Sequence, residues 1–221
     1  MNIFNFCSDS FASVAAVSLV PIMENNKAFD RIEIYTVDDG ISDQNKSELE
    51  KLVRTYNRVI HFIKAPDPSI IFEYSFKTRY QMGHSYSRMC IGTILPDHVE
   101  KVLCLDSDTL ILDSLSELWN IDMGQHIMAG VSECINLKSY GRRFQLDIDN
   151  IYCNAGILLV DLKKWREENI EDKLKQEIDK YNGNIFFFEQ TLMSRMCKGR
   201  VLRLHPKYNC YTAFLLLIIK I

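Results

Sequence analysis

Two patterns of apolar residues alternate along the chain, and each predicts a different kind of element. Short apolar or alternating runs predict strands, whereas apolar residues that recur every three or four positions predict amphipathic helices. Strands and helices that follow one another in this way indicate a mainly parallel sheet covered by helices, so the sequence predicts an α/β fold. The predicted strands span residues 2–6, 31–37, 59–64, 101–105, 126–131 and 155–162, and the predicted helices span residues 13–23, 42–55, 83–95 and 163–181.

Size and composition are those of one globular domain. The chain has 221 residues, of which 47% are hydrophobic and 25% are charged, a balance that provides ample material for a core. Its net charge of -3 gives no basic footprint, so no nucleic-acid partner is expected. The seven cysteines are scattered and no pair has the C-x-x-C spacing of a zinc site, so we expect reduced thiols.

The apolar runs are too short to cross a membrane, because a spanning helix needs about 20 apolar residues. The N-terminal stretch MNIFNFCSDS lacks the charged region and the long apolar core of a signal peptide. We therefore expect a cytoplasmic protein without a transmembrane segment, which leaves peripheral association with the inner face of the membrane open.

Two carboxylates, Asp106 and Asp108, interrupt the most strand-like segment of the chain, KVLCLDSDTLIL at residues 101–112. In open α/β sheets ligands bind beyond the carboxyl ends of strands, which is where this pair falls. Side chains alternate along an extended segment, so both aspartates are expected to point to one side and to hold a divalent cation together with phosphate and water. A turn that carries two solvated aspartates is the structural alternative.

Two other acidic motifs can be tested by their spacing. An EF-hand loop requires an oxygen ligand at its fifth position and glycine at its sixth, and here these positions are Leu110 and Ile111. A phosphatase of the haloacid-dehalogenase type has threonine or valine where this chain has Leu110, and it carries its motif on the first strand. The EF-hand is excluded, and a magnesium-dependent phosphatase is kept as the weaker alternative.

The context of the acidic pair resembles glycosyltransferase family 8, whose members are retaining enzymes similar to bacterial lipopolysaccharide galactosyl- and glucosyltransferases and, more distantly, to glycogenin. The resemblance covers nearly the whole chain and depends on the order and spacing of several segments. These segments are VDDGISDQNK (37–46), YSRMCIGTILPDHVEKVLCLDSDTLILDSLSELWNID (86–122), YCNAGILLVDLKKWREENI (152–170), FFFEQTLMS (186–194) and HPKYN (205–209).

The resemblance implies a single nucleotide-sugar-binding, Rossmann-like domain with the glycosyltransferase A-type fold. It implies transfer of a hexose, galactose or glucose, from a UDP-sugar to a carbohydrate or glycolipid acceptor, as in lipopolysaccharide biosynthesis. It also implies a Mn²⁺ or Mg²⁺ cofactor, which would act as a Lewis acid on the diphosphate leaving group. A catalytically inactive nucleotide-sugar-binding remnant is the alternative within the same fold.

The resemblance also assigns individual residues. Asp106 and Asp108 match the metal-binding pair. Glu189 and Gln190 lie where the family has an Asp-Gln pair beside the anomeric carbon, where a carboxylate and an amide stabilise an oxocarbenium-like transition state. The residues assigned to the nucleotide and the sugar are Cys7, Asp9, Ser10, Arg88, Asp106, Ser107, Asp108, Glu133, Asn154 and Ala155.

Three of these assignments have structural alternatives. Arg88 could be a solvated helical arginine, Asn154 could belong to a turn that enters a strand, and Glu189 could be an acidic residue in the first turn of a helix.

Three departures from the family pattern affect these expectations. The N-terminal segment places Ser10 at a nucleotide-contacting position, and Glu189 is one methylene longer than the usual aspartate. The family's C-terminal His-x-x-G-x-x-K-P-W segment is absent, and His205 does not match it. We therefore interpret residues 1–221 as one catalytic domain that lacks the C-terminal metal- and diphosphate-binding segment. The apolar stretch AFLLLIIKI at its end is then expected to mark a truncation, and a buried last strand or helix is the alternative.

Overall fold

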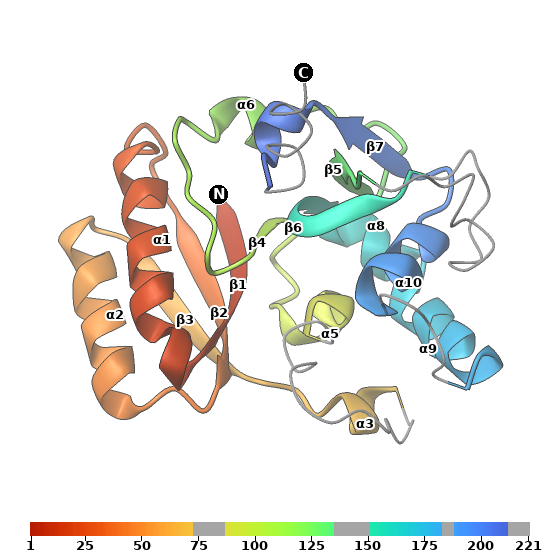
Figure 1. The fold of residues 1–221 in the computed structure, drawn as a ribbon, viewed down its shortest axis with the longest axis horizontal. Coiled ribbons are helices and arrows are strands. Elements are labelled where there is room, and N and C mark those ends of the chain that lie inside the picture. Colours follow the sequence, from red (N-terminus) through yellow and green to blue (C-terminus); the bar gives the residue numbers. More distant parts are fainter. Residues whose placement is uncertain (73–86, 135–150, 183–187, 212–221) are drawn as a thin grey trace.

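Seven strands form one sheet in the part of the chain that the computed structural model describes, residues 1–72, 87–134, 151–182 and 188–211 (Figure 1). Their order across the sheet is β3-β2-β1-β4-β6-β5-β7. The strands are β1 (Asn2–Ser8), β2 (Glu33–Asp39), β3 (Val59–Lys64), β4 (Lys101–Leu105), β5 (Met128–Ser132), β6 (Cys153–Asp161) and β7 (Val201–Leu204).

The sheet is mainly parallel, as predicted, but β6 runs in the opposite direction. Strand β1 pairs in parallel with β2 and β4, and β5 pairs in parallel with β7. Strand β6 is antiparallel to both of its neighbours, β4 and β5. An antiparallel neighbour needs no crossover helix, and the apolar run of β6 is the same whichever way the strand points. The periodicity therefore located this strand and could not indicate its direction.

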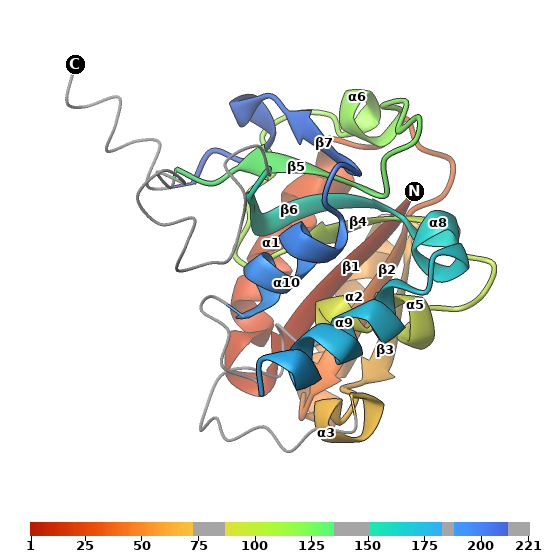
Figure 2. The same ribbon diagram turned by 90° about the vertical axis from the view of Figure 1, so that its right-hand side faces the viewer.

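Helices cover both faces of the sheet, which explains why its strands are nearly continuous apolar runs. Helices α1 (Ala12–Glu24) and α2 (Asp43–Thr55) pack on one face (Figure 1). Helices α5 (Ile91–Ile94), α8 (Leu162–Glu167), α9 (Ile170–Lys180) and α10 (Phe188–Met196) lie on the other, as Figure 2 shows. Consecutive residues of β1 illustrate the two cores, because Ile3 packs toward α1 and Phe4 toward the opposite layer.

Several shorter helical segments connect these elements. They are η1 (Asp9–Phe11), α3 (Pro68–Ile71), α6 (Ser116–Trp119) and η2 (Pro206–Tyr208). No helix among the described residues is long and apolar enough to span a bilayer. The apolar stretch at 213–221 lies outside the described residues, and so does part of the predicted helix at 83–95. The described part of that helix is interrupted at Cys90, which forms a turn between helical residues 87–89 and α5.

The long helix predicted over 163–181 is wrong, because the chain breaks it into α8 and α9. Asn169 adopts a left-handed conformation with φ of 50°, which no helix interior accommodates. Asp161 caps the first piece by accepting a hydrogen bond from the Lys164 N–H at 3.0 Å. The apolar stripe continues through both pieces, so periodicity alone does not reveal the break.

Replacing Asn169 with alanine should lower the free energy of unfolding by about 1 kcal/mol, because alanine tolerates the left-handed conformation less well than asparagine. Urea denaturation measures the change. Asn120→Ala is the matched control, since Asn120 is also an exposed residue at a helix end but has φ of -92°. Equal losses in the two variants would contradict a conformational origin.

Candidate active site

The carboxyl ends of β1 and β4 lie side by side and bring the N-terminal segment next to the acidic pair. The two strands are parallel neighbours, and each ends just before a polar segment, at Ser8 and Leu105 respectively. The Ser107 hydroxyl joins the two ends by donating a hydrogen bond to the Phe6 carbonyl. Two distant segments of the chain therefore lie next to each other at the edge of the sheet where the sequence predicts ligand binding.

The acidic pair lies in a turn, which corrects the expectation of an extended segment. The Thr109 N–H donates to the Asp106 carbonyl at 3.1 Å, and β4 has already ended. Exposure nevertheless alternates, because Asp106 and Asp108 are exposed while Ser107 between them is 8% exposed. Both carboxylates are thus accessible to solvent, although they lie in a turn and not in the extended segment that the sequence predicted.

Both carboxylates keep oxygens that could bind a hard cation. Asp106 uses Oδ1 for an ion pair with Arg88, and neither Asp106 Oδ2 nor the Asp108 carboxylate accepts a hydrogen bond from the described residues. Oxygen atoms of this kind suit Mg²⁺ or Mn²⁺. No group of three or more His, Cys, Asp or Glu side chains is close enough to hold a metal in the described part of the chain, so oxygens of a bound ligand or water would have to complete the coordination.

Arg88 links the acidic pair to the start of α10. Its side chain donates to Asp106 Oδ1 at 2.6 Å through Nη2 and to Glu189 Oε1 at 2.7 Å through Nη1. Burial alone would lower the pKa of Arg88, but the neighbouring carboxylates of Glu189 and Asp106 outweigh that effect and hold the pKa above its ordinary value. Arg88 and Glu189 are each only 8% exposed. The alternative that Arg88 is a solvated helical arginine is therefore excluded. For Glu189 the two interpretations are compatible, because this residue lies in the first turn of α10 and also pairs with Arg88.

The beginning of β6 gathers the residues assigned to the sugar. Asn154 donates from Nδ2 to Glu133 Oε2 at 2.9 Å, and the Ala155 N–H donates to Gln190 Oε1 at 3.1 Å. These bonds connect the end of β5, the start of β6 and the first turn of α10. Asn154 is itself within β6, so its alternative role in an entry turn does not hold.

Gly156 lies between Asn154, which is assigned to the sugar, and Asp106, which is assigned to the metal. A β-carbon added there would be 3.0 Å from Asn154 Oδ1 and 3.3 Å from Asp106 Oδ2. The Asp106 N–H also donates to the Gly156 carbonyl at 2.9 Å. The absence of a side chain at this position therefore allows the sugar-assigned amide and the metal-assigned carboxylate to approach the same backbone.

Replacing Gly156 with alanine should impair ligand binding more than folding, because the new methyl group must displace polar side chains at the site. Gly130→Ala is the comparison: its β-carbon would be 2.7 Å from Leu158 Cδ2 in the core, so it should mainly lower stability. Melting temperature and UDP affinity measured for both variants distinguish the two effects. Wild-type affinity in a well-folded Gly156→Ala protein would contradict this account of the site.

The N-terminal residues divide into one buried and two accessible groups. Cys7 is fully buried and its thiol donates to the Ser8 carbonyl at 3.2 Å, with a pKa that burial raises to about 11. A contact between Cys7 and a nucleotide would therefore come from its backbone. Asp9 and Ser10 are exposed, and they lie on the segment that follows β1.

Asp9 also holds η1 against α2. Its Oδ1 accepts hydrogen bonds from the Ser42 N–H at 2.8 Å and from Asn45 Nδ2 at 2.7 Å. The Ser42 backbone N–H is the main reason why the pKa of Asp9 is lowered. Ser42 in turn caps α2 by accepting from the Asn45 N–H, as its position predicted. This network orients the Asp9 carboxylate at the edge of the site.

Sequence reasoning missed two residues of the cluster, Asn209 and Tyr211. Asn209 is 8% exposed and donates from Nδ2 to Asn154 Oδ1 at 2.8 Å. The Tyr211 hydroxyl accepts from the Cys134 N–H at 2.7 Å, and burial raises its pKa. Asn209 belongs to the HPKYN segment, whereas Tyr211 lies just after it. His205 of the same segment is exposed and caps η2 by accepting from the Lys207 N–H.

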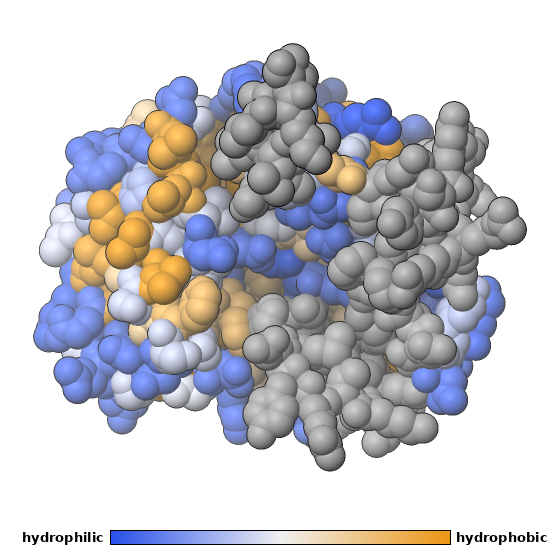
Figure 3. Space-filling model, viewed as in Figure 1, coloured by the Kyte–Doolittle hydropathy of each residue, from blue (hydrophilic) through white to orange (hydrophobic). Residues whose placement is uncertain are grey.

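Figure 3 shows apolar surface on the side of the molecule where α1 lies. Leu110 and Leu112, which follow the pair, are 59% and 88% exposed, and Val17 of α1 is 63% exposed. Ser18 attaches the two segments by donating from its hydroxyl to the Thr109 carbonyl at 2.5 Å. The rim of the candidate site is therefore apolar here and polar toward β6.

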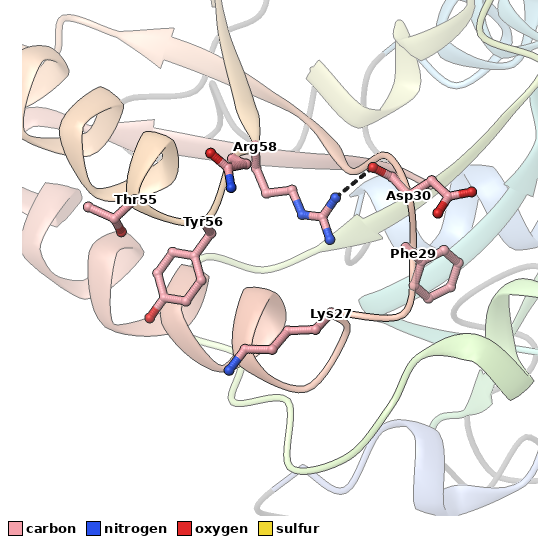
Figure 4. Close-up of a pocket in the computed structure, with 7 residues that line it drawn as sticks. Lys27, Phe29, Asp30, Thr55, Tyr56 and Arg58 are labelled. Carbon is pink, nitrogen blue, oxygen red and sulfur yellow. Dashed lines mark hydrogen bonds between the residues drawn. The ribbon is translucent and has the colours of Figure 1, made fainter.

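A separate hollow lies at the opposite edge of the sheet, near the amino ends of β2 and β3 (Figure 4). Arg58 crosses it and donates to the Asp30 carbonyl at 2.8 Å. The lining residues are Lys27, Phe29, Asp30, Thr55, Tyr56, Asn57 and Arg58. None of the residues assigned from the sequence lines this hollow, so the candidate active site is the polar cluster at the other edge.

Comparison with known proteins shows which family the chain matches. The model of the family described as Glycosyl transferase family 8 matches residues 2–216. A putative glycosyltransferase of Haemophilus influenzae is 31% identical over 212 residues, which are 95% of this chain and 63% of that protein. General stress protein A of Bacillus subtilis is 23% identical over 221 residues, covering 98% of this chain and 76% of the relative.

Solved structures support the same fold. The galactosyltransferase LgtC, in complex with donor and acceptor sugar analogues, matches with a TM-score of 0.81 and 25% identity over 94% of this chain and 74% of LgtC. The predicted α/β fold of the glycosyltransferase A type is thereby confirmed. This chain spans less than two thirds of the length of the Haemophilus protein, 63%.

Proposed function

The chain belongs to glycosyltransferase family 8, and from this we propose that it transfers a hexose, galactose or glucose, from a UDP-sugar to a carbohydrate acceptor with retention of configuration. The observation that carries the proposal is the buried connection through Arg88. This residue joins a carboxylate that would face a diphosphate, Asp106, to one that would face a sugar, Glu189. A nucleotide-sugar donor contains both a diphosphate and a sugar, so it could contact both carboxylates.

The acidic pair requires a cation if it is to bind a diphosphate, because two carboxylates repel two phosphates. Asp106 and Asp108 would hold Mn²⁺ or Mg²⁺, which would neutralise the negative charge that develops on UDP as the glycosidic bond breaks. Arg88 fixes the Asp106 carboxylate by occupying Oδ1 and leaving Oδ2 toward the ligand. Asp9 and Ser10, on the adjacent segment, would contact the nucleoside.

The sugar would lie between β6 and α10. Glu133 and Asn154 supply an acceptor and a donor suited to sugar hydroxyl groups, and Glu189 with Gln190 would lie beside the anomeric carbon. Positive charge develops there in an oxocarbenium-like transition state, so a fixed carboxylate lowers its free energy. Arg88 fixes the direction of the Glu189 carboxylate through the bond to Oε1.

For the acceptor we propose a carbohydrate or a glycolipid, as for the lipopolysaccharide galactosyl- and glucosyltransferases that the sequence resembles. The reaction would then take place in the cytoplasm, at the inner face of the membrane.

Replacing Glu189 with glutamine tests the assignment of the sugar-facing carboxylate. We expect hydrolysis or transfer of UDP-galactose and UDP-glucose to slow by about 100-fold, since a charge that stabilises the transition state is lost. UDP affinity should stay nearly unchanged, because Arg88 still pairs with Asp106. Glu177→Gln, at an ion pair between α9 and α10, is the control and should leave turnover unchanged.

Two results would count against this assignment. A loss of UDP affinity that matches the loss of turnover would give Glu189 a nucleotide-binding or structural role. UDP-sugar binding by the wild type without turnover of either donor would indicate a nucleotide-sugar-binding protein without transferase activity.

A further inference from the structure

The buried amide of Asn209 contacts the sugar-assigned residues from a segment that has no other role in the proposed reaction. Asn209 follows η2, is 8% exposed, and donates from Nδ2 to Asn154 Oδ1 at 2.8 Å. Its own backbone N–H donates to the Pro206 carbonyl at 3.1 Å. The short helical turn therefore delivers this amide to β6 in a defined position.

Asn209 is one of two donors that fix the orientation of the Asn154 amide. Asn154 Oδ1 accepts two hydrogen bonds, from the Gly156 N–H at 2.9 Å and from Asn209 Nδ2 at 2.8 Å. A backbone N–H can only donate, so Oδ1 must face that side and Nδ2 must face away from it. Nδ2 then donates to Glu133 Oε2 at 2.9 Å. An inverted amide would lose these bonds and set an oxygen against the Glu133 carboxylate.

Glu133 is held at both oxygens, and one of these two contacts comes from Asn154. Oε2 accepts from Asn154, and Oε1 accepts at 3.1 Å from the Cys134 N–H, which also donates to the Tyr211 hydroxyl at 2.7 Å. A carboxylate oxygen has lone pairs beyond the one used by each donor, and these can accept hydrogen bonds from hydroxyl groups. A carboxylate fixed in this way discriminates between hydroxyl arrangements, whereas a rotating one adapts to either.

The same network adjoins the acidic pair. A β-carbon at Gly156 would be 3.3 Å from Asp106 Oδ2 and 3.5 Å from Asn209 Nδ2. A sugar that contacts Glu133 and Asn154 would therefore lie next to a diphosphate at Asp106, as the chemistry of a nucleotide-sugar requires.

We infer that Asn209 is a positioning residue that acts through Asn154 on Glu133, and that it thereby sets how well the site distinguishes the hexose of the donor. The inference rests on the proposed function, because it concerns the sugar half of a UDP-sugar. It predicts that Asn209 affects the additional affinity that the sugar provides, and not the affinity for UDP itself.

Calorimetric titration of the full chain with UDP, UDP-galactose and UDP-glucose in the presence of Mn²⁺ tests the inference. For Asn209→Ala we expect the affinity of the preferred UDP-hexose to fall by roughly three- to tenfold, the effect of one hydrogen bond, while UDP affinity stays unchanged. The ratio of the two UDP-hexose affinities should move toward one. Lys207→Ala is the matched control, since it removes the pair with Glu117 from the same helical turn without touching Asn154.

A double-mutant cycle separates positioning from a general loss of structure. In a Glu133→Gln background, Asn209→Ala should have little further effect on UDP-hexose affinity, because the group on which it acts has already been altered. Additive losses, or an equal fall in UDP affinity, would overturn the inference.

Amide NMR gives a readout that does not depend on the donor. The Asn154 side-chain NH₂ protons should exchange slowly with solvent in the wild type and faster in Asn209→Ala. Unchanged exchange would overturn the inference even if the protein binds UDP-sugars. Failure of the wild type to bind either UDP-hexose, together with the expected exchange behaviour, would instead refute the proposed function.

Discussion

Replacing Arg88 with methionine should both destabilise the protein and nearly abolish turnover, the largest combined effect that we expect from a single substitution. The guanidinium bridges Glu189 and Asp106, and Glu189 is only 8% exposed. Methionine would leave that carboxylate buried without its charged partner. Removing one member of a buried ion pair costs about 3–5 kcal/mol, which urea denaturation would detect.

The ion pair between Arg195 and Glu177 provides the matched control. It joins α10 to α9, and the Arg195 side chain is as well buried as that of Arg88, at 10% exposure in both cases. Arg195→Met should lower stability and leave UDP affinity and turnover per folded molecule close to the wild-type values. If Arg88→Met behaves like this control and keeps its turnover, Arg88 stabilises the fold without organising the site.

Replacing Asp108 with asparagine should remove the Mn²⁺ dependence of UDP affinity. Asp108 is exposed and makes no ion pair within the described residues, so the substitution should leave stability within about 0.5 kcal/mol of the wild type. Loss of an anionic ligand should weaken UDP binding in saturating Mn²⁺ by at least about tenfold. Even replacing a residue that only hydrogen-bonds to a metal ligand can have an effect of that size.

Asp113→Asn is the control, because Asp113 is an exposed aspartate of the same segment whose Oδ1 accepts from the Ser114 N–H. It changes the net charge by the same amount and should leave the Mn²⁺ dependence intact. Equal UDP affinity for wild type and Asp108→Asn at saturating Mn²⁺ would mean that the acidic pair is the solvated turn that the sequence also allows.

Local patterns predicted the strands, and they also indicated where the candidate site lies, because both depend on neighbouring residues. The apolar runs at 2–6 and 101–105 coincide with β1 and β4, and the carboxyl ends of parallel neighbours must meet. The direction of β6 and the left-handed Asn169 were missed, since neither changes the apolar periodicity. These features depend on tertiary packing and on the backbone conformation of one residue.

The contacts within the site could be predicted only in part. Arg88, Asp106 and Glu189 were assigned individually, but their bridge joins residues 101 positions apart, and no local pattern indicates such a bond. Asn209 was missed because a buried asparagine after a short helical turn looks like any turn residue until its partner on β6 is known. The resemblance supplied the residue types, whereas the structure supplied their connections.

Calorimetric titration of the wild-type chain with UDP, in Mn²⁺ and again in EDTA, tests the central proposal most directly. CMP and GDP serve as nucleotide controls. We predict binding of UDP that depends on Mn²⁺ and that is stronger than the binding of either control. UDP binding of equal strength in Mn²⁺ and in EDTA, or the absence of UDP binding in both, would contradict the proposal that Asp106 and Asp108 hold the diphosphate of a UDP-sugar through a divalent cation.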